Sequence, residues 1–135
     1  MTPFPFEIGI GESIGNARRI MLQRKIHHLP VMENNELRGL VSDRDIKLIL
    51  GPEFDYPDPK ELTVEDAMVD DPYVVDSETS VIAVLDELAR RHIGAALVTK
   101  KGRLVGIFST SDACREFSIW LKREFHGSSG GSDIA

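Results

Sequence analysis

The segment Gly39-Leu40-Val41-Ser42-Asp43-Arg44-Asp45 returns later in the chain as Gly106-Ile107-Phe108-Ser109-Thr110-Ser111-Asp112. In both segments two apolar residues follow the glycine, as at the end of a strand. Ser-x-x-Asp follows at once, which is the spacing of an N-terminal helix cap. Each segment therefore predicts a corner at which a strand runs directly into a helix.

The two corners belong to a longer internal repeat, because residues 1–46 align with residues 68–113 without a gap. The identical pairs are Met1/Met68, Pro5/Pro72, Ser13/Ser80, Arg24/Arg91, Ile26/Ile93, Val31/Val98, Leu37/Leu104, Gly39/Gly106, Ser42/Ser109 and Asp45/Asp112. Apolar patterning alone does not dictate Gly, Pro, Ser and Asp at matching positions, so we interpret the match as a tandem duplication.

Each copy predicts the same order of elements. A short strand (6–10 and 73–76) precedes a helix capped by Ser13 or Ser80. Two further strands follow, at 29–32 and 38–41 in the first copy and at 95–99 and 104–108 in the second. A second helix begins near Asp43 or Ser111. The sequence therefore predicts an α+β fold built as a tandem βαββα repeat.

The predicted boundaries follow from the same pattern. Repeat 1 covers residues 1–50, a Pro-rich acidic linker covers 51–61, repeat 2 covers 62–125, and 126–135 form a disordered Gly/Ser tail. Repeat 2 opens with a lead-in, 62–67, that predicts a short helix capped by Thr63. The first copy has no equivalent, since the sequence starts at Met1.

Composition narrows the class of protein. Hydrophobic residues make up 41% and charged residues 28%, as in soluble globular domains. The net charge of -6 argues against nucleic acid as a partner, although a few local donors can still hold a small anion. The sequence contains no apolar run of the roughly 20 residues that span a bilayer, and its N-terminus does not resemble a signal peptide. We therefore expect a cytoplasmic protein that makes no membrane contact.

The corners support two interpretations that do not exclude each other. In the structural one, the serine and the aspartate only cap a helix. In the functional one, free amides and the helix dipole bind a phosphate, the serine donates to it, and the aspartate accepts ribose hydroxyls. The glycine would leave room for the ligand, and the small residues 94–96 would leave room for a planar ring.

The order and repetition of these motifs resemble a tandem pair of cystathionine-β-synthase (CBS) domains, also called a Bateman module. The resemblance covers about residues 1–50 and 62–125. Its motifs are Met1-Thr2-Pro3 with Pro5, the stretch 26–31, both corners, Ala67-Met68, Pro72 and Ser80. It implies a CBS-domain pair with pseudo-two-fold symmetry, two clefts between the sheets, and a homodimer. It also implies a regulatory, ligand-sensing role in which AMP, ADP, ATP, NAD or S-adenosylmethionine is the ligand, with AMP or ATP foremost and no cofactor required.

The resemblance also assigns roles to residues. Asp45 and Asp112 match ribose-binding acids, Ser42 and Ser109 match phosphate-facing hydroxyls, and the stretches Phe6-Glu7-Ile8 and Tyr73-Val74-Val75 match strands beside the base. His28 matches a basic phosphate contact; its neighbour is His27, and Arg44 lies within the first corner. The second copy has Gly94, Ala95 and Ser111 in place of His27, His28 and Arg44. We therefore expect two unequal clefts, with these basic residues around the first corner.

Other functions are weighed against this one. His27 and His28 would point to opposite faces of a strand, which disfavours a shared metal ion. Cys114 is expected to be a core thiol, and no catalytic set recurs with persuasive spacing, so we expect no enzyme activity. The main alternative is a dimerisation or interaction scaffold without a bound nucleotide, because Phe117, Trp120, Leu121 and Phe125 give the last helix a wide apolar surface. In either case the output would pass to an effector protein.

Overall fold

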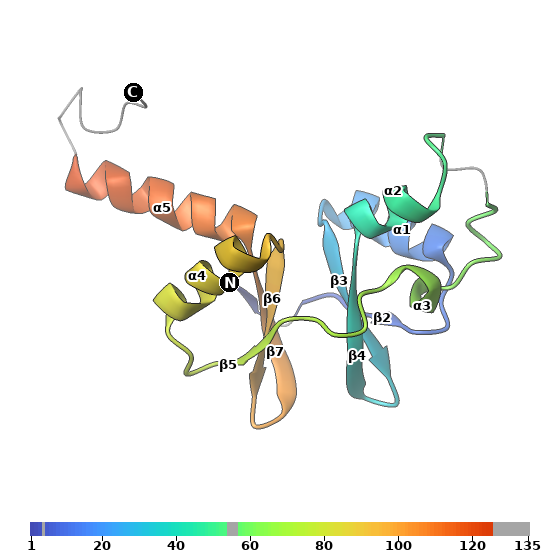
Figure 1. Ribbon diagram of the computed structural model, residues 1–135, viewed down its shortest axis with the longest axis horizontal. Coiled ribbons are helices and arrows are strands. Elements are labelled where there is room, and N and C mark those ends of the chain that lie inside the picture. Colours follow the sequence, from blue (N-terminus) through green and yellow to red (C-terminus); the bar gives the residue numbers. More distant parts are fainter. Residues whose placement is uncertain (4, 54–56, 126–135) are drawn as a thin grey trace.

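The computed structural model describes residues 1–3, 5–53 and 57–125 (Figure 1). The predicted disordered tail, 126–135, and the middle of the predicted linker, 54–56, lie outside the described residues. Two α+β units lie side by side, each with a sheet of long strands and helices packed against it (Figure 1).

The first unit contains a three-stranded sheet in the order β2-β3-β4. Its elements are β2 (Ile8–Gly9), α1 (Ile14–Arg24), β3 (His28–Glu33), β4 (Glu36–Ser42) and α2 (Asp43–Ile49). β2 runs parallel to β3, and β3 runs antiparallel to β4. This order confirms the predicted βαββα unit.

The second unit repeats that order with one additional strand. Its elements are β5 (Val74–Asp76), α4 (Val81–Arg91), β6 (Ala95–Lys100), β7 (Arg103–Ser109) and α5 (Thr110–Glu124). The sheet has four strands in the order β1-β7-β6-β5 because β1 (Thr2–Pro3) joins its edge. The predicted α+β fold and tandem repeat are therefore confirmed.

The chain segments at the start of each repeat cross to the other unit. β1 pairs antiparallel with β7, so that Thr2 lies opposite Ile107. At the aligned positions Val69 bridges Leu40, and their backbone groups exchange hydrogen bonds of 3.0 and 2.8 Å. Since both crossings relate equivalent residues, they give the pair its pseudo-two-fold symmetry.

These crossings explain the repeated glycine of the corners. A Cβ at Gly39 would lie 2.5 Å from the carbonyl oxygen of Val69 and 2.9 Å from Sδ of Met68. At Gly106 the nearest atom would be Sδ of Met1, also at 2.5 Å. The prediction that this glycine leaves room for a ligand is therefore wrong, because the crossing segment fills the space.

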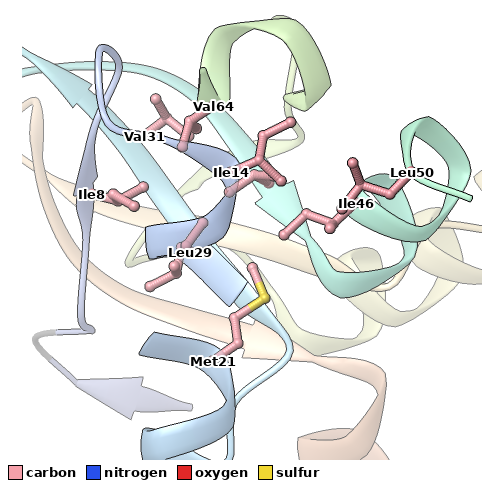
Figure 2. Packing of buried hydrophobic residues seen from close by; sticks show 10 residues of the cluster. Ile8, Ile14, Met21, Leu29, Val31, Ile46, Leu50 and Val64 are labelled. Carbon is pink, nitrogen blue, oxygen red and sulfur yellow. The ribbon is translucent and has the colours of Figure 1, made fainter. Parts of the chain in front are cut away.

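The larger hydrophobic core belongs to the first unit (Figure 2). It contains Ile8, Ile14, Ala17, Met21, Leu29, Val31, Val41, Ile46, Leu50 and Val64. Val64 comes from α3 (Val64–Ala67), the predicted lead-in helix of repeat 2, and it is fully buried. Repeat 2 by sequence thus contributes a helical turn to the core of the first unit, whereas its own buried clusters are smaller.

The last helix lies largely outside both cores. In α5 the one buried residue is Asp112, while Phe117 and Trp120 are 61% and 52% exposed and stack with ring centroids 6.2 Å apart. Cys114 is exposed, so the prediction of a core thiol is wrong. An amphipathic pattern does not show which face of a helix the rest of the chain covers. Within the described part of the chain, none of the helices has the length and apolar character needed to cross a membrane.

Candidate functional site

Two clefts lie where the units meet, and each contains one of the repeated corners. The corner-1 cleft, of about 290 Å³, includes Ser42, Arg44 and Asp45 in its wall. The corner-2 cleft, of about 320 Å³, includes Ser109, Ser111 and Asp112. Both clefts are open to solvent, so a small ligand could enter either one.

The two clefts are built from equivalent positions. Each residue that lines the corner-2 cleft has its aligned counterpart in the wall of the corner-1 cleft. The pairs are Pro5/Pro72, Phe6/Tyr73, Lys25/His92, Ile26/Ile93, His27/Gly94, His28/Ala95, Ile107/Leu40, Ser109/Ser42, Ser111/Arg44, Asp112/Asp45 and Arg115/Leu48. The pseudo-symmetry of the fold therefore extends to its candidate binding sites.

Each cleft combines the corner of one repeat with residues of the other repeat. Tyr73 and Ala95 face the first corner, whereas Phe6 and both histidines face the second. This corrects the expectation that His27, His28 and Arg44 together surround the first corner. Arg44 does lie there, but His27 is found in the corner-2 cleft and His28 lines both clefts.

The reason lies in the direction of the His28 side chain. Its backbone pairs with that of Ser42 in the first sheet, but its ring reaches the second unit. A Cβ at Gly94 would lie 3.1 Å from Nε2 of His28. The glycine that replaces a histidine in the second copy therefore provides the space for His28 of the first.

The serine and aspartate of both corners form capping boxes, as the structural interpretation predicts. The amide of Ser42 donates to Oδ2 of Asp45 at 2.8 Å, and the amide of Asp45 donates to Oγ of Ser42 at 3.1 Å. The second corner repeats both bonds between Ser109 and Asp112, at 2.9 and 3.1 Å. Because each box uses Oδ2 of its carboxylate, a cap and a ligand contact through Oδ1 are compatible.

The two aspartates differ in their second oxygen. Oδ1 of Asp112 accepts a hydrogen bond of 3.0 Å from Nη1 of Arg115. Burial raises the pKa of Asp112, but hydrogen bonds from Ser109 and Arg115 outweigh it and hold the pKa below the ordinary 3.8. The counterpart of Arg115 is Leu48, which is 78% exposed, and the two hydrogen bonds that the Asp45 carboxylate accepts from Ser42 both reach Oδ2.

The histidines differ in environment. Burial lowers the pKa of His28 below its ordinary 6.5, and the nearby carboxylates of Asp43, Asp45 and Asp112 offset this only in part. The shift favours the neutral form of His28. His27 is exposed, and its Nδ1 lies 3.0 Å from Oδ2 of Asp43. Within the described residues no group of three or more His, Cys, Asp or Glu side chains is arranged to hold a metal ion.

Basic residues that the sequence analysis did not assign lie in or beside both clefts. The guanidinium of Arg24 lies 4.6 Å from the centre of the Phe6 ring, and Arg91 lies 5.3 Å from that of Tyr73. The identity of Arg24 and Arg91 in the repeat alignment was the signal that could have found them. Lys25 and His92 cap α1 and α4 in left-handed conformations and add a basic side chain to each cleft wall.

Four of the predicted base-flanking residues do not line either cleft within the described residues. Ile8 is buried in the first core, and Val75 lines a separate hollow beside α4. Glu7 and Val74 are exposed. Each predicted strand segment (6–10 and 73–76) therefore supplies only its leading aromatic residue to a cleft, because the residues that follow alternate between the core and solvent.

Comparison with known proteins identifies the family. The family model of the CBS domain matches residues 1–51 and 64–119. The chain therefore belongs to the CBS-domain family and contains two copies of the domain, which confirms the resemblance of its motifs.

Relatives of the sequence include proteins of different lengths. The chain is 33% identical over 110 residues to an uncharacterized 33.4 kDa protein in the ribosomal RNA operon of Thermofilum pendens; the match covers 75% of this chain and 36% of that protein. It is 26% identical over 117 residues to a CBS domain-containing protein of Dictyostelium discoideum, covering 79% of this chain and 80% of the relative. The chain thus spans about a third of the first relative and most of the second.

Solved structures share the fold. CBSX2 in complex with AMP matches with a TM-score of 0.77 at 24% identity, covering 91% of this chain and 95% of that one. The CBS domain of a bacterial CNNM/CorC family Mg²⁺ transporter in complex with ATP matches with a TM-score of 0.74 at 23% identity, covering 87% and 83%. At these identities the likeness shows the fold, and a ligand for this chain remains a matter of proposal.

Proposed function

We propose that this CBS pair is a regulatory module that senses an adenine nucleotide, AMP or ATP, in the clefts between its units. The observation that carries the proposal is the equivalence of the two clefts. Each one joins a Ser-x-x-Asp corner of one repeat to an aromatic ring and basic side chains of the other. Two structures of the same fold are complexes with AMP and with ATP, which supports this class of ligand.

In the proposed complex the corner-1 cleft is the stronger site. Oδ1 of Asp45 accepts a hydroxyl of the ribose, while Oδ2 keeps the helix cap. Arg44 and Arg91 supply positive charge for the phosphates, and the ring of Tyr73 flanks the base. In the corner-2 cleft a ribose would compete with Arg115 for Asp112, so the affinity there is lower.

We further propose how the module works in the cell. It acts without catalysis and passes its signal to an effector protein in the cytoplasm, with neither nucleic acid nor membrane as a partner. Homodimerisation accompanies it, since the exposed rings of Phe117 and Trp120 on α5 offer an apolar surface for a second copy.

Calorimetric and thermal-shift titrations with AMP, ADP, ATP, NAD and S-adenosylmethionine test the proposal. A ligand present at about a hundred times its Kd adds roughly 2.7 kcal/mol to the free energy of unfolding, which a melting curve detects easily. If all five compounds leave the melting temperature unchanged at millimolar concentration, the scaffold interpretation replaces the sensor.

Substitution of the corner aspartates separates binding from capping. Asp45→Ala and Asp112→Ala each remove a helix cap, which lowers the free energy of unfolding by roughly 0.5–2 kcal/mol. The matched control is Asp66→Ala, because Asp66 accepts from the amide of Thr63 at 2.9 Å in a third capping box, outside both clefts. We expect all three variants to lose stability and only the first two to lose nucleotide affinity. Equal affinity in Asp66→Ala and Asp45→Ala would contradict the assignment.

A further inference from the structure

A hollow between α1 and α2 lies beside the corner-2 cleft. Its volume is about 460 Å³, which is larger than either cleft and within the range of small-molecule sites. It shares Lys25, Ile26 and His27 with the wall of the corner-2 cleft. The rest of its lining comes from the two helices and consists of Arg18, Met21, Leu22, Asp43, Ile46 and Lys47.

The base of the hollow is apolar. Met21 and Ile46 are 4% and 1% exposed and belong to the core of the first unit (Figure 2). Leu22 is 64% exposed, so it lies at the rim. A ligand in the hollow would therefore cover aliphatic surface that water now reaches.

Positive charge surrounds this apolar base, although the net charge of the chain is -6. The lining contains the cationic side chains of Arg18, Lys25 and Lys47, and a single carboxylate, that of Asp43. Oδ2 of Asp43 lies 3.8 Å from Nζ of Lys47 and 3.0 Å from Nδ1 of His27. One carboxylate does not balance three cations, so the hollow favours an anion.

The second unit indicates that the fold does not need these charges. The counterparts of Arg18, Lys25 and Lys47 are Leu85, His92 and Cys114. The apolar base, in contrast, has the apolar counterparts Leu88, Ile93 and Ala113. The apolar positions thus belong to the packing that both repeats share, whereas the cluster of fixed positive charge is particular to the first.

The lining differs in chemistry from both clefts. Each cleft contains a serine hydroxyl and the ring of Phe6 or Tyr73. Among the described residues that line the hollow there is no Ser, Thr, Phe, Tyr or Trp. It therefore offers neither a hydroxyl for a sugar or phosphate nor a phenyl ring or indole against which a base could stack, and its aliphatic surface suits a flexible hydrocarbon.

We propose that this hollow is a further ligand site, which binds a carboxylate with an aliphatic chain, such as a medium-chain fatty acid. The chain covers Met21, Leu22 and Ile46, and the carboxylate lies among the cationic side chains at the rim.

Calorimetric titration of the intact protein with decanoate tests the site. We expect saturable binding at micromolar to millimolar concentration. Each methylene that leaves water raises the affinity about fourfold, so octanoate should bind roughly tenfold more weakly than decanoate. Acetate supplies the charge without the chain and decanol the chain without the charge, and both should bind at least about tenfold more weakly. Equal affinity of decanol and decanoate, or no binding of decanoate at millimolar concentration, would overturn the proposal.

The protein offers a matched pair of variants for this titration. Lys47 and Lys122 are both exposed and lie in the last turns of α2 and α5, but only Lys47 lines the hollow. We expect Lys47→Glu to weaken decanoate binding at least about tenfold and Lys122→Glu to leave it unchanged. Equal effects in the two variants would refute the site. If decanoate does not bind and Lys47→Glu changes the mass in light scattering, the hollow is instead a contact with a second copy, and the proposal is overturned.

A consequence for the corner-2 cleft rests on the proposed nucleotide function. Because both sites are lined by Lys25 and His27, a carboxylate in the hollow and a phosphate in the cleft draw on the same positive charge. Saturating decanoate should therefore weaken nucleotide binding several-fold, and the nucleotide should weaken decanoate binding by the same factor. Binding of decanoate without any nucleotide would contradict the sensor alone, whereas binding of a nucleotide without decanoate would contradict this site alone.

Discussion

Substitution by alanine at the two repeated glycines, Gly39 and Gly106, should lower the free energy of unfolding by very different amounts. Substitution of either one by alanine adds a Cβ 2.5 Å from a neighbouring atom. At Gly39 that atom is the carbonyl oxygen of Val69, which also accepts the Leu40 amide at 3.0 Å. At Gly106 it is Sδ of Met1, the flexible end of a side chain that is 53% exposed.

The loss of stability depends on which atoms must move to relieve the clash with the new Cβ. Relief of the clash in Gly39→Ala shifts the backbone of the crossing segment, with an overpacking cost of about 1–3 kcal/mol and weakening of hydrogen bonds worth about 1 kcal/mol each. In Gly106→Ala a change of rotamer in Met1 suffices, at roughly 1 kcal/mol or less. Both variants regain about 0.4–1 kcal/mol from the less flexible unfolded chain. The net loss is therefore about 2–4 kcal/mol for Gly39→Ala and close to zero for Gly106→Ala.

Calorimetry and urea denaturation measure this difference directly. For a domain of this size each kcal/mol corresponds to about 4 °C in melting temperature, so we expect Gly39→Ala to melt roughly 8–16 °C below wild type. Gly106→Ala should stay within about 4 °C of wild type. Equal shifts in the two variants would refute the reasoning, because it rests on the contrast between a fixed backbone atom and a mobile side chain.

Three further predictions concern the clefts and the last helix. Because the folded pKa of His28 lies below its ordinary 6.5, its contribution to stability is present above that pH and is lost as the pH falls through the folded pKa. In His28→Asn the melting temperature should therefore fall less at acid pH than in wild type. A nucleotide phosphate that contacts His28 should bind more tightly at acid pH. A flat affinity profile from about pH 5.5 to 8 would refute that contact. Arg115→Gln releases Oδ1 of Asp112, so the pKa of Asp112 should rise in an NMR titration and adenosine affinity should increase in calorimetry; unchanged values would show that the ion pair does not limit the site. Phe117→Ser with Trp120→Ser should convert a dimer into a monomer in light scattering with little loss of fold stability, since both rings are exposed, and an unchanged mass would show that another surface pairs the subunits.

The sequence predicted the repeated elements well because their signals are local. Ser42 and Asp45 specify the start of α2 through a cap that involves only neighbouring residues, and α2 begins at Asp43 as expected. The α5 helix begins at Thr110, one residue before the predicted Ser111. Tertiary packing does not have to be known for such features, so a single sequence is sufficient.

The last helix shows where local reasoning fails. The apolar residues of α5 have the spacing of an amphipathic helix, and Cys114, which lies inside that helix, was expected to be a core thiol. In the structure both Cys114 and Phe117 are exposed. An amphipathic helix reports that a partner surface exists, but the pattern does not distinguish the chain's own sheet from a second molecule.

Residues that share a cleft could not be predicted from the repeat alone. His27 and His28 belong to the same repeat as Ser42 and Asp45, and the sequence analysis therefore placed them around the first corner. The structure places His27 with the second corner, because the units pack across the pseudo-two-fold axis. Alternation within one strand is visible in a sequence, whereas the packing of one unit against the other is a long-range property.

This exchange has a consequence for the proposed sensor. Since each cleft takes its corner from one unit and its aromatic ring from the other, we expect a nucleotide in either cleft to contact both units and to stabilise their contact. His28 lines both clefts, and a Cβ at Gly94 would lie 3.1 Å from its Nε2. If the phosphates in both clefts contact this imidazole, we expect occupation of one cleft to change the affinity of the other, and the coupling to be reciprocal.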